Sequence, residues 1–392
     1  MSDAASNLDV FYGYARKTGL PGTRNHALII SLSGLEYVVA RDLGARFPDA
    51  VLITTMYGRG HVGEDLRFQR HMMIALATHP NVGGVLVLAP DRQMAEEISD
   101  VTASSGRLVS SVSLDEVGED AEKMFESSVE KLKNIVSQLT LEKPVQFPIN
   151  QLAMAIECGH SGASSGMVAN PLVGEFSKHL VSRSGRVLFS ETLEWTGTES
   201  VLESRSAIPE IGDRIRQAIK RRQDIALANG HQIGENNPGP QNHVGGITTL
   251  VEKSLGAIAK GGDQSIMGLL EAGEALPEEA GLYLMDTPCF SPESISSMIA
   301  SGAQMVLFTT DQGNPYSSAI APTIKVTANP ISAKLVNQID FDASKAFTGH
   351  VTPKSLLPEL SELVVAVASG KKTKAEMANF GTEAISRLGP SI

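Results

Sequence analysis

The loop Cys158–Gly166 holds the densest run of residues that could do chemistry. It contains three glycines, three serines, a cysteine and a histidine between a predicted strand and a predicted helix. Glycines let backbone N–H groups approach a ligand, and a helix N-terminus attracts negative charge. The loop therefore predicts a site for a carboxylate, sulfonate or phosphate, with the hydroxyls of Ser161, Ser164 and Ser165 as donors. The alternative is a tight strand-to-helix turn with a serine cap. The loop has neither the ending of a P-loop nor a GxGxxG fingerprint.

Two side chains of this loop and one after the next predicted strand could hold a metal ion. Cys158 and His160 suit a soft or borderline metal, and Glu157 or Glu191 would be a further ligand. The residues alone favour the alternative of a buried cysteine and a hydrogen-bonded histidine. Glu191 and Glu194 stand three residues apart after a strand, where carboxylates act as bases or metal ligands, or cap the next helix. We select Glu191 and His160 as candidate catalytic residues.

A stretch rich in amide side chains follows at Asn236–Gly246. The amides of Asn236, Asn237 and Asn242 can hold several hydroxyl groups, because each amide both donates and accepts hydrogen bonds. The alternative is a well-ordered surface loop. Downstream, Glu252-Lys253-Ser254 lies on a predicted helix with one member facing inward, and we select Lys253 as a further catalytic candidate.

Weaker signals come from polar residues beside other predicted strands. Arg24 and Asn25 precede the first strand, and Arg24 could make a bidentate contact with a carboxylate. Arg59 and Gln312 lie in flexible loops after strands. We include these four residues as candidate substrate contacts, although an arginine at a strand entrance is otherwise usually a surface residue.

The elements that must position these residues alternate between strand and helix. Short apolar runs separated by amphipathic segments predict parallel sheets covered by helices, with ligands at the carboxyl ends of the strands. We expect an α/β fold of two Rossmann-like units with mainly parallel sheets, residues 1–145 and 146–392, the second carrying most site motifs. The main predicted strands are His26–Leu32, Ala50–Thr54, Val82–Leu88, Leu108–Val112, Leu152–Glu157, Arg186–Ser190, Gly281–Met285 and Gln304–Thr309.

Composition excludes several classes of protein. The 392 residues carry a net charge of −11, which disfavours nucleic acid as a partner. Two cysteines exclude a disulfide scaffold. No apolar run is long enough for a membrane helix, and no secretory signal opens the chain, so we expect a cytoplasmic protein without membrane contact.

Taken together, the motifs resemble the altronate/galactarate dehydratase family, in its large C-terminal catalytic portion, and also the sulfolactate sulfo-lyase large subunit. The matches run in order through nearly the whole chain. They are Gly22-Thr23-Arg24-Asn25, His79-Pro80-Asn81-Val82, Glu157-Cys158-Gly159, Ala169-Asn170-Pro171, Ser190-Glu191-Thr192, Asn236-Asn237-Pro238, Glu252-Lys253-Ser254, Met285-Asp286-Thr287-Pro288 and Pro322-Thr323-Ile324-Lys325.

The resemblance implies a hydro-lyase that dehydrates a short 2,3-dihydroxy acid to a 2-oxo-3-deoxy acid with a divalent metal, iron or manganese. The sulfolactate branch implies a carbon–sulfur lyase that releases sulfite and a 2-oxo acid. The family also implies a small domain of about ninety residues. Because this chain begins near the large-subunit motif at Tyr12-Gly13-Tyr14, we expect a separate small subunit. We also expect a homo-oligomer.

Departures from the family pattern open a third interpretation. Arg59 stands where the family usually has the cysteine of Gly-Cys-Gly, and Pro90 where it has that of Gly-Cys-Glu. The missing cysteines weaken the expectation of a metal, and Arg59 suits a substrate with a second anionic group. A non-enzyme that only binds hydroxy acids or a partner subunit is the alternative.

Overall fold

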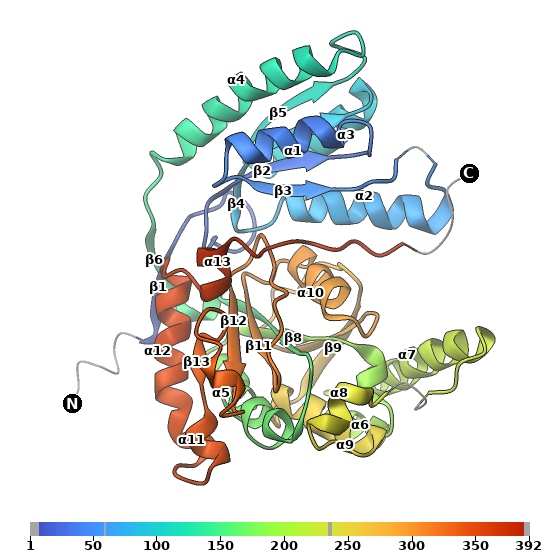
Figure 1. Ribbon diagram of the computed structural model, residues 1–392, viewed down its shortest axis with the longest axis vertical. Helices are drawn as coiled ribbons and strands as arrows, with labels where there is room; N and C mark the ends of the chain where they lie inside the picture. The colour runs from blue at the N-terminus through green and yellow to red at the C-terminus, as the bar shows by residue number, and fades with distance from the viewer. Residues whose placement is uncertain (1–7, 59, 234–236, 388–392) are drawn as a thin grey trace.

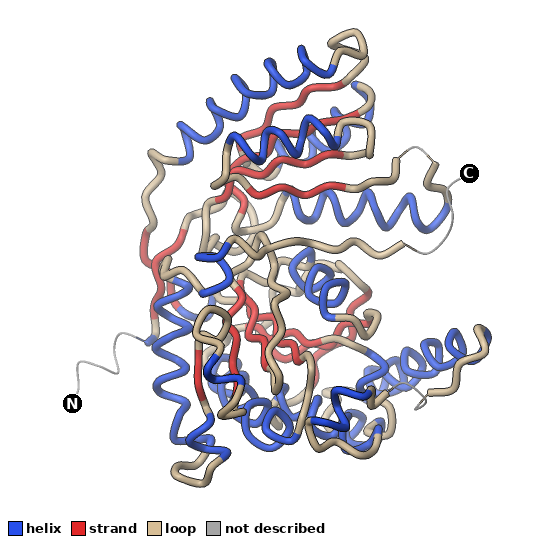
Figure 2. Tube along the Cα trace, viewed as in Figure 1, coloured by secondary structure: helices blue, strands red, loops and turns tan. Residues whose placement is uncertain are grey.

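The computed structural model describes residues 8–58, 60–233 and 237–387. In this part of the chain, strands and helices alternate and build two parallel sheets, one of four strands and one of seven. Figure 2 shows both sheets enclosed by helices. The predicted class, α/β with two Rossmann-like units, is confirmed.

The smaller sheet has the order β3-β2-β4-β5 among the described residues, with all neighbours parallel. Successive residues of β2 point to opposite faces: Leu28 and Ile30 pack toward α2 and α3, while Ala27 and Ile29 pack toward α1 and α4. The elements are β2 His26–Ser31, α1 Tyr37–Arg46, β3 Val51–Thr54, α2 Gly63–Ala77, β4 Val82–Ala89, α3 Arg92–Ser104, β5 Leu108–Ser113 and α4 Ala121–Leu139.

The larger sheet has the order β13-β12-β11-β7-β8-β10-β9 in the described part, again all parallel. Helices α5, α7 and α12 cover one face and α10 covers the other. Its strands are β7 Ala153–Cys158, β8 Arg186–Phe189, β9 Ile266–Glu271, β10 Gly281–Asp286, β11 Met305–Thr309, β12 Thr323–Thr327 and β13 Phe341–Asp342. Its helices are α5 Asn170–Ser182, α6 Glu199–Ser204, α7 Pro209–Ala228, α8 Pro240–Val244, α9 Leu250–Ile258, α10 Ser291–Ala300, α11 Ser344–Phe347, α12 Leu357–Ala368 and α13 Lys374–Ala378.

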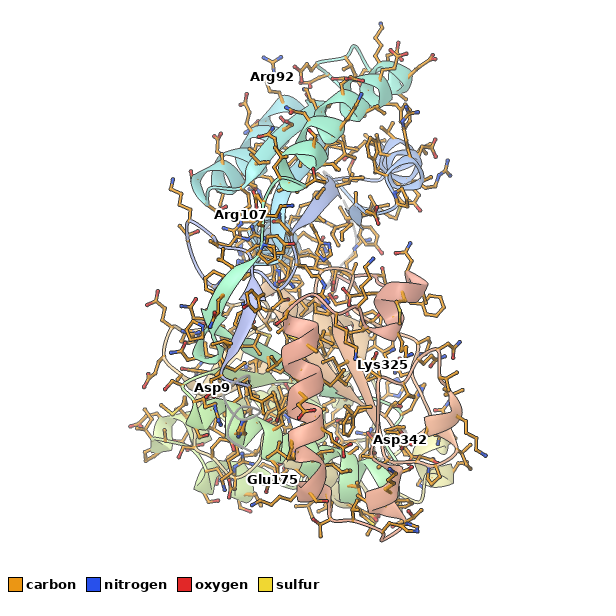
Figure 3. The ribbon with its side chains drawn as sticks, turned by 90° about the vertical axis from the view of Figure 1, so that its left-hand side faces the viewer. Asp9, Arg92, Arg107, Glu175, Lys325 and Asp342 are labelled. Carbon is orange, nitrogen blue, oxygen red and sulfur yellow. The ribbon has the colours of Figure 1, made fainter. Side chains whose placement is uncertain are left out.

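The two units are joined by an apolar core and by a short ribbon. The face of the smaller sheet under α2 and α3 shares one buried cluster with the face of the larger sheet under α10. The ribbon pairs β1 Val10–Gly13 with β6 Val145–Pro148 in antiparallel register. Arg107 lies where the units meet (Figure 3), and its guanidinium donates to the carbonyls of His79 and Ser105, just past the ends of α2 and α3. The units are therefore packed as one body.

The segment after α13 runs back along the smaller unit beside α2 (Figure 1). Gln69 of α2 donates to the carbonyl of Ser386, and the Glu383 carboxylate accepts from Ser296 of α10. No helix in the described ranges is long and apolar enough to cross a bilayer.

Arg24 is a second joint between the units. Its guanidinium pairs with Glu376 of α13 at 2.7 Å and donates to the carbonyls of Val367 and Lys371. The neighbouring Thr23 hydroxyl donates to the carbonyl of Gln304, just before β11. Arg24 therefore lies at the amino ends of the strands of the larger sheet, away from the edge where α/β folds bind ligands.

We expect Arg24→Gln to lower the free energy of unfolding by about 2 to 3 kcal/mol. This lies between the ~0–1 kcal/mol of exposed ion pairs and the ~3–5 kcal/mol lost when a buried pair is broken. Urea denaturation measures the change, and Arg41→Gln is the control because the Arg41–Asp42 pair is exposed. Equal stability of the two variants would show that Arg24 is no joint.

Candidate active site

The carboxyl ends of three neighbouring strands carry most of the predicted chemistry. β7, β8 and β10 are adjacent in the larger sheet; Cys158 ends β7, Glu191 follows β8 by two residues, and Asp286 ends β10. Because the strands are parallel, these ends meet at one edge. Helices α6, α8 and α9 gather at this end of the larger unit (Figure 1).

Glu157 and Glu191 form a buried pair of carboxyl groups. Glu157 is fully buried, Glu191 is 4% exposed, and the two side chains are close enough to influence each other's protonation. Oε2 of Glu157 also accepts from the hydroxyl of Ser294 at 2.8 Å. Burial, reinforced by the charges of Glu157 and Glu194, raises the pKa of Glu191 well above its usual range, and burial also raises the pKa of Glu157. The pair therefore holds a proton to higher pH than two separate carboxyl groups would.

Glu194 lies beside this pair between two ammonium groups. Its Oε1 is 3.0 Å from Nζ of Lys253, and its Oε2 is 4.0 Å from Nζ of Lys260. Nζ of Lys260 also donates to Sγ of Cys158 at 3.2 Å. Burial alone would raise the pKa of Glu194, but the two lysines outweigh it and lower this pKa. The surroundings therefore favour the ionised form of Glu194 and the protonated form of Glu191.

The chain holds Glu191 in a conformation that few side chains adopt. Its φ is +71°, in the left-handed region, just before the short helix η4 Thr192–Trp195. The backbone N–H of Glu191 donates to Thr287, and the hydroxyl of Thr192 donates to Asp286 at 2.7 Å. Arg222 pairs with Asp286 from α7 at 2.9 Å. Strained conformations of this kind persist where the surroundings impose them, and they are frequent at functional sites.

The loop Cys158–Gly166 lies against the same strand ends but uses its serines internally. The hydroxyl of Ser164 donates to Asp311, and that of Ser165 donates to the carbonyl of Gly162. A Cβ at Gly162 would lie 2.4 Å from the carboxylate of Asp311, so only glycine permits this approach. A π-helical turn, η3 Ser165–Ala169, precedes α5. The role of these serines as substrate donors stays a prediction.

His160 lies in this loop with its ring outside the carboxyl and lysine cluster. Its φ is +52°, its side chain is exposed, and its Nδ1 is 2.8 Å from the carbonyl of Gly313. A carbonyl only accepts hydrogen bonds, so Nδ1 carries the proton and, in the neutral ring, Nε2 is left as a base.

Part of the predicted amide loop reaches the cluster. Oδ1 of Asn237 accepts from Nζ of Lys253 at 2.6 Å. Asn242 donates from Nδ2 to the carbonyl of Ser161, so α8 is fastened to the loop after β7. Gln312 donates to the carbonyl of Gln241 in the same region. Asn236 and Arg59 lie outside the described residues.

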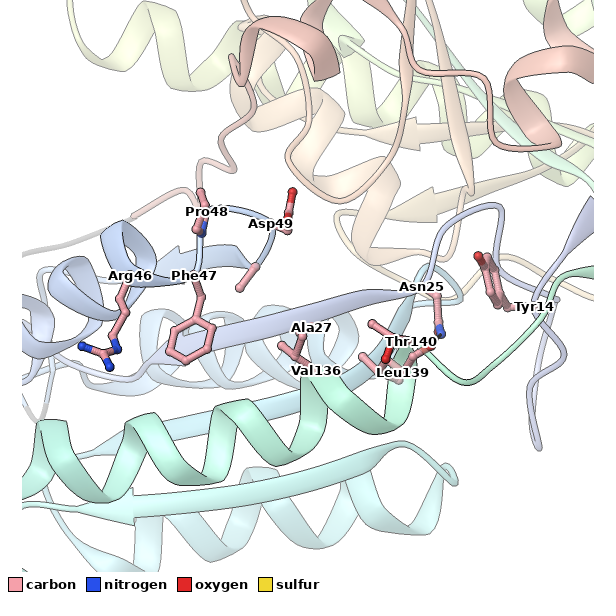
Figure 4. A pocket seen from close by; sticks show the side chains of 11 residues that line it. Tyr14, Asn25, Ala27, Arg46, Phe47, Pro48, Asp49, Val136, Leu139 and Thr140 are labelled. Atoms are coloured by element: carbon pink, nitrogen blue, oxygen red, sulfur yellow. Dashed lines mark hydrogen bonds between the residues drawn. The ribbon is translucent and has the colours of Figure 1, made fainter.

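Two predicted substrate contacts do not join the cluster. Arg24 lies at the joint at the opposite ends of the strands, where Glu376 and backbone carbonyls occupy its guanidinium. Asn25 donates to Glu142 at 3.0 Å and lines a hollow of about 410 Å³ between α1 and α4 (Figure 4). None of the other predicted site residues lines this hollow. Both residues precede a strand and therefore lie at the opposite end of a parallel sheet from the cluster, and their role as substrate contacts stays a prediction.

Lys260 is the cluster residue that the sequence analysis missed. It is fully buried in the turn η5 Ala259–Gly261, directly after α9. The available signal was its spacing, because a residue seven positions after Lys253 lies on the same helix face. Lysine is almost never fully buried without a partner, so a lysine directly after the apolar run Leu255–Ala259 was a second signal.

One group of three side chains offers enough donor atoms to hold a metal ion. Sγ of Cys158 and carboxylate oxygens of Glu191 and Glu194 all lie within 4.8 Å of one another, and this is the group found in the described part of the chain. Glu194 stands there in place of the predicted ligand His160. However, Nζ of Lys253 lies 3.0 Å from Glu194, and Nζ of Lys260 lies 3.2 Å from Sγ of Cys158 and 4.0 Å from Glu194. Two of the three donors are already paired with ammonium groups, so the residues do not fit a divalent metal as they are arranged.

Two models of known protein families match this chain, one over each of the two parallel sheets. The family model described as "D-galactarate/Altronate dehydratase, C-terminal" matches residues 149–391, and "D-galactarate dehydratase/Altronate hydrolase, second domain" matches residues 13–140. The altronate dehydratase of Bacillus subtilis is 31% identical over 97% of this chain and 78% of its own length. The (2R)-sulfolactate sulfo-lyase subunit beta of Chromohalobacter salexigens is 27% identical over 96% of this chain and 97% of its own length. The galactarate dehydratase (L-threo-forming) of Escherichia coli is 30% identical over 76% and 58%. These relatives are lyases.

Proposed function

Because the chain belongs to the D-galactarate/altronate dehydratase family, we propose that it is a lyase that dehydrates a short 2,3-dihydroxy acid to a 2-oxo-3-deoxy acid. The observation that carries the proposal is the buried Glu157–Glu191 pair beside the Glu194–Lys253 ion pair. Neighbouring charges give nearby carboxyl groups different protonation states. An elimination needs both a group that donates a proton and a group that stabilises the developing negative charge.

The reaction breaks two bonds on neighbouring carbons. A base takes the proton from C2, the C3–O bond breaks with its electron pair on oxygen, and a proton from an acid completes the leaving water. The enol that remains becomes the 2-oxo acid by moving its hydroxyl proton to C3. Glu191, whose pKa is raised by burial, suits the acid. The ammonium of Lys253 suits the negative charge that develops on the substrate carboxylate.

His160 is the candidate base. Its Nδ1 contacts a carbonyl, which leaves Nε2 free to take a proton in the neutral ring. Gln312, Asn237 and Asn242 belong to the segments around this end of the sheet and are proposed to hold substrate hydroxyls. Because the residues do not fit a divalent metal as arranged, no step of the proposal passes through iron or manganese.

We expect His160→Asn to lower kcat by about 10²-fold or more, within the range of general acid–base catalysis. Asparagine tolerates a left-handed φ, so the loop should keep its shape while losing the base. Steady-state kinetics with the acid that the protein turns over measures the loss. His350→Asn, at an exposed histidine, is the control. A variant with the wild-type kcat would exclude His160 as the base.

A sulfo-lyase reaction is the second candidate, and one observation favours it. This chain and the sulfolactate sulfo-lyase subunit beta match over nearly the full length of both. In that reaction the C3–S bond breaks, sulfite leaves with the electron pair, and the enol again gives a 2-oxo acid. The relative's name as a subunit also supports a separate small partner subunit, which we propose for this chain together with a homo-oligomer.

Product analysis tests the function directly. The purified protein is incubated with altronate, galactarate and (2R)-sulfolactate, and 2-oxo acid and sulfite are measured separately. A 2-oxo acid without sulfite supports the hydro-lyase, and equal amounts of both support the sulfo-lyase. Binding of these acids by calorimetry without any product, also after adding a co-expressed small subunit, would favour the non-enzyme interpretation.

A further inference from the structure

Two lysine ammonium groups contact two of the three side chains that could together hold a metal ion. We propose that Lys253 and Lys260 form a permanent cationic centre that replaces a divalent metal at Cys158, Glu191 and Glu194 and stabilises the anionic transition state of the proposed elimination. The inference rests on the proposed function for its catalytic part only. The exclusion of a metal from these three donors follows from the charges of the two lysines and does not depend on the proposed function.

Distances between the charged atoms support the replacement. Nζ of Lys253 is 3.0 Å from Oε1 of Glu194, so this oxygen is already in a direct ion pair. Nζ of Lys260 is 3.2 Å from Sγ of Cys158 and 4.0 Å from the second oxygen of Glu194. A metal ligand lies about 2.0–2.3 Å from its ion. A divalent ion on these donors would therefore approach two ammonium groups closely, and like charges repel strongly in a buried site.

Lys260 is fixed in place and cannot swing away from an incoming ion. Its side chain is fully buried, and its carbonyl accepts from the hydroxyl of Ser177 in α5 at 3.0 Å. Its Nζ lies 5.6 Å from the centre of the Phe189 ring, which adds a cation–π contact. A Cβ at the next residue, Gly261, would lie 2.7 Å from the same ring, so the turn is packed tightly on β8.

The two lysines then have different tasks. The side chain of Lys253 is 13% exposed and also contacts Asn237, so it can meet a substrate carboxylate. Lys260 has no exposed surface. It acts as a positioning residue, because it holds Glu194 and Cys158 and prevents both from binding a cation.

Cobalt binding tests the inference without relying on activity. The protein is purified without oxygen or chelator, its metal content is measured by elemental mass spectrometry, and it is titrated with Co²⁺ while the thiolate-to-cobalt absorption is recorded. We expect far less than one ion per chain and no thiolate band in the wild-type protein. We expect Lys260→Met, which keeps the apolar stem but removes the charge, to gain a band that Cys158→Ser abolishes.

Matched variants keep the test decisive. Lys220→Met is the control, because Lys220 makes an exposed pair with Asp224 in α7 and should leave the titration unchanged. Cys289→Ser excludes a band from the second cysteine. If Lys260→Met fails to fold, the titrations of the wild-type protein and of Lys253→Met still test the proposal. The proposal is overturned if the wild-type protein binds one ion tightly and shows a thiolate band that Cys158→Ser abolishes.

Product analysis separates the two proposals. Turnover that survives dialysis against a chelator, with no bound metal, supports both. Turnover that needs one ion bound through Cys158 overturns the cationic centre and keeps the lyase. No turnover and no metal supports the exclusion of a metal and counts against the proposed function.

Discussion

Replacing Glu191 by glutamine should lower kcat by about 10²–10⁴-fold, the range of general acid–base catalysis. The amide keeps the size of the side chain but cannot give up a proton to the leaving group. The neighbouring Glu157 cannot substitute, because it is fully buried and bonded to Ser294. Steady-state kinetics with the acid that the protein turns over measures the loss, which should fall on kcat more than on KM.

A stability measurement shows that this loss is chemical. The pKa of Glu191 is raised in the folded chain, so its carboxyl contributes stability below its unfolded pKa of about 4.3, and this contribution is lost as the pH rises through the folded value. The variant lacks this dependence. We therefore expect Glu191→Gln to unfold in urea at pH 8 at the same concentration as the wild-type protein or a higher one.

An exposed glutamate serves as the matched control for this variant. Glu271 ends β9 at the same edge of the sheet and is exposed to solvent, so Glu271→Gln should change kcat less than twofold. A Glu191→Gln variant that is stably folded and as active as the Glu271 control would remove Glu191 from the mechanism.

Replacing Glu194 by glutamine should lower the free energy of unfolding by about 3 to 5 kcal/mol, the cost of leaving buried charges without their partner. Two ammonium groups depend on this carboxylate, and Lys260 has no exposed surface on which water could replace it. The expected loss is therefore larger than for any exposed ion pair of the chain. Urea denaturation at pH 7 measures it, with Asp224→Asn in the exposed pair with Lys220 as the control.

The pH dependence of this effect has the opposite sign to that of Glu191. The lysines lower the pKa of Glu194, so its stabilisation is present above the unfolded pKa and is lost as the pH falls through the folded value. The difference between wild-type and variant should therefore shrink on acidification below about pH 4. A difference that stays constant from pH 7 to pH 3 would mean that the ion pairs with Lys253 and Lys260 do not stabilise the fold.

The sequence by itself determined the class of fold and its central strands. The run Val82–Leu88 is apolar without alternation, which indicates a strand buried on both faces, and β4 is buried throughout. Three strands of the larger sheet were not among the predicted strands. They are β9, β12 and β13, and they lie toward the edges of the sheet. β9 and β13 end in exposed acidic residues, and β12 carries two threonines and a lysine, so their apolar pattern is weaker.

The local sequence also pointed to Cys158 and Glu191, because each follows a buried strand and parallel strands end at a common edge. It could not tell that Glu194 completes this group in place of His160, whose side chain is exposed to solvent. Nor could it tell that Arg24 serves a joint between the units, because its partner Glu376 is hundreds of residues away.

Only the tertiary structure decided the charge of the site. Lys253 and Lys260 belong to one helical segment, whereas Glu157, Glu191 and Glu194 follow two strands far from it in the chain. Periodicity in a sequence reports which residues share a local face, but pKa values and ion pairs depend on distances in space and on exclusion of water. Those are set when α9 packs against η4 over the strand ends, which no local pattern encodes.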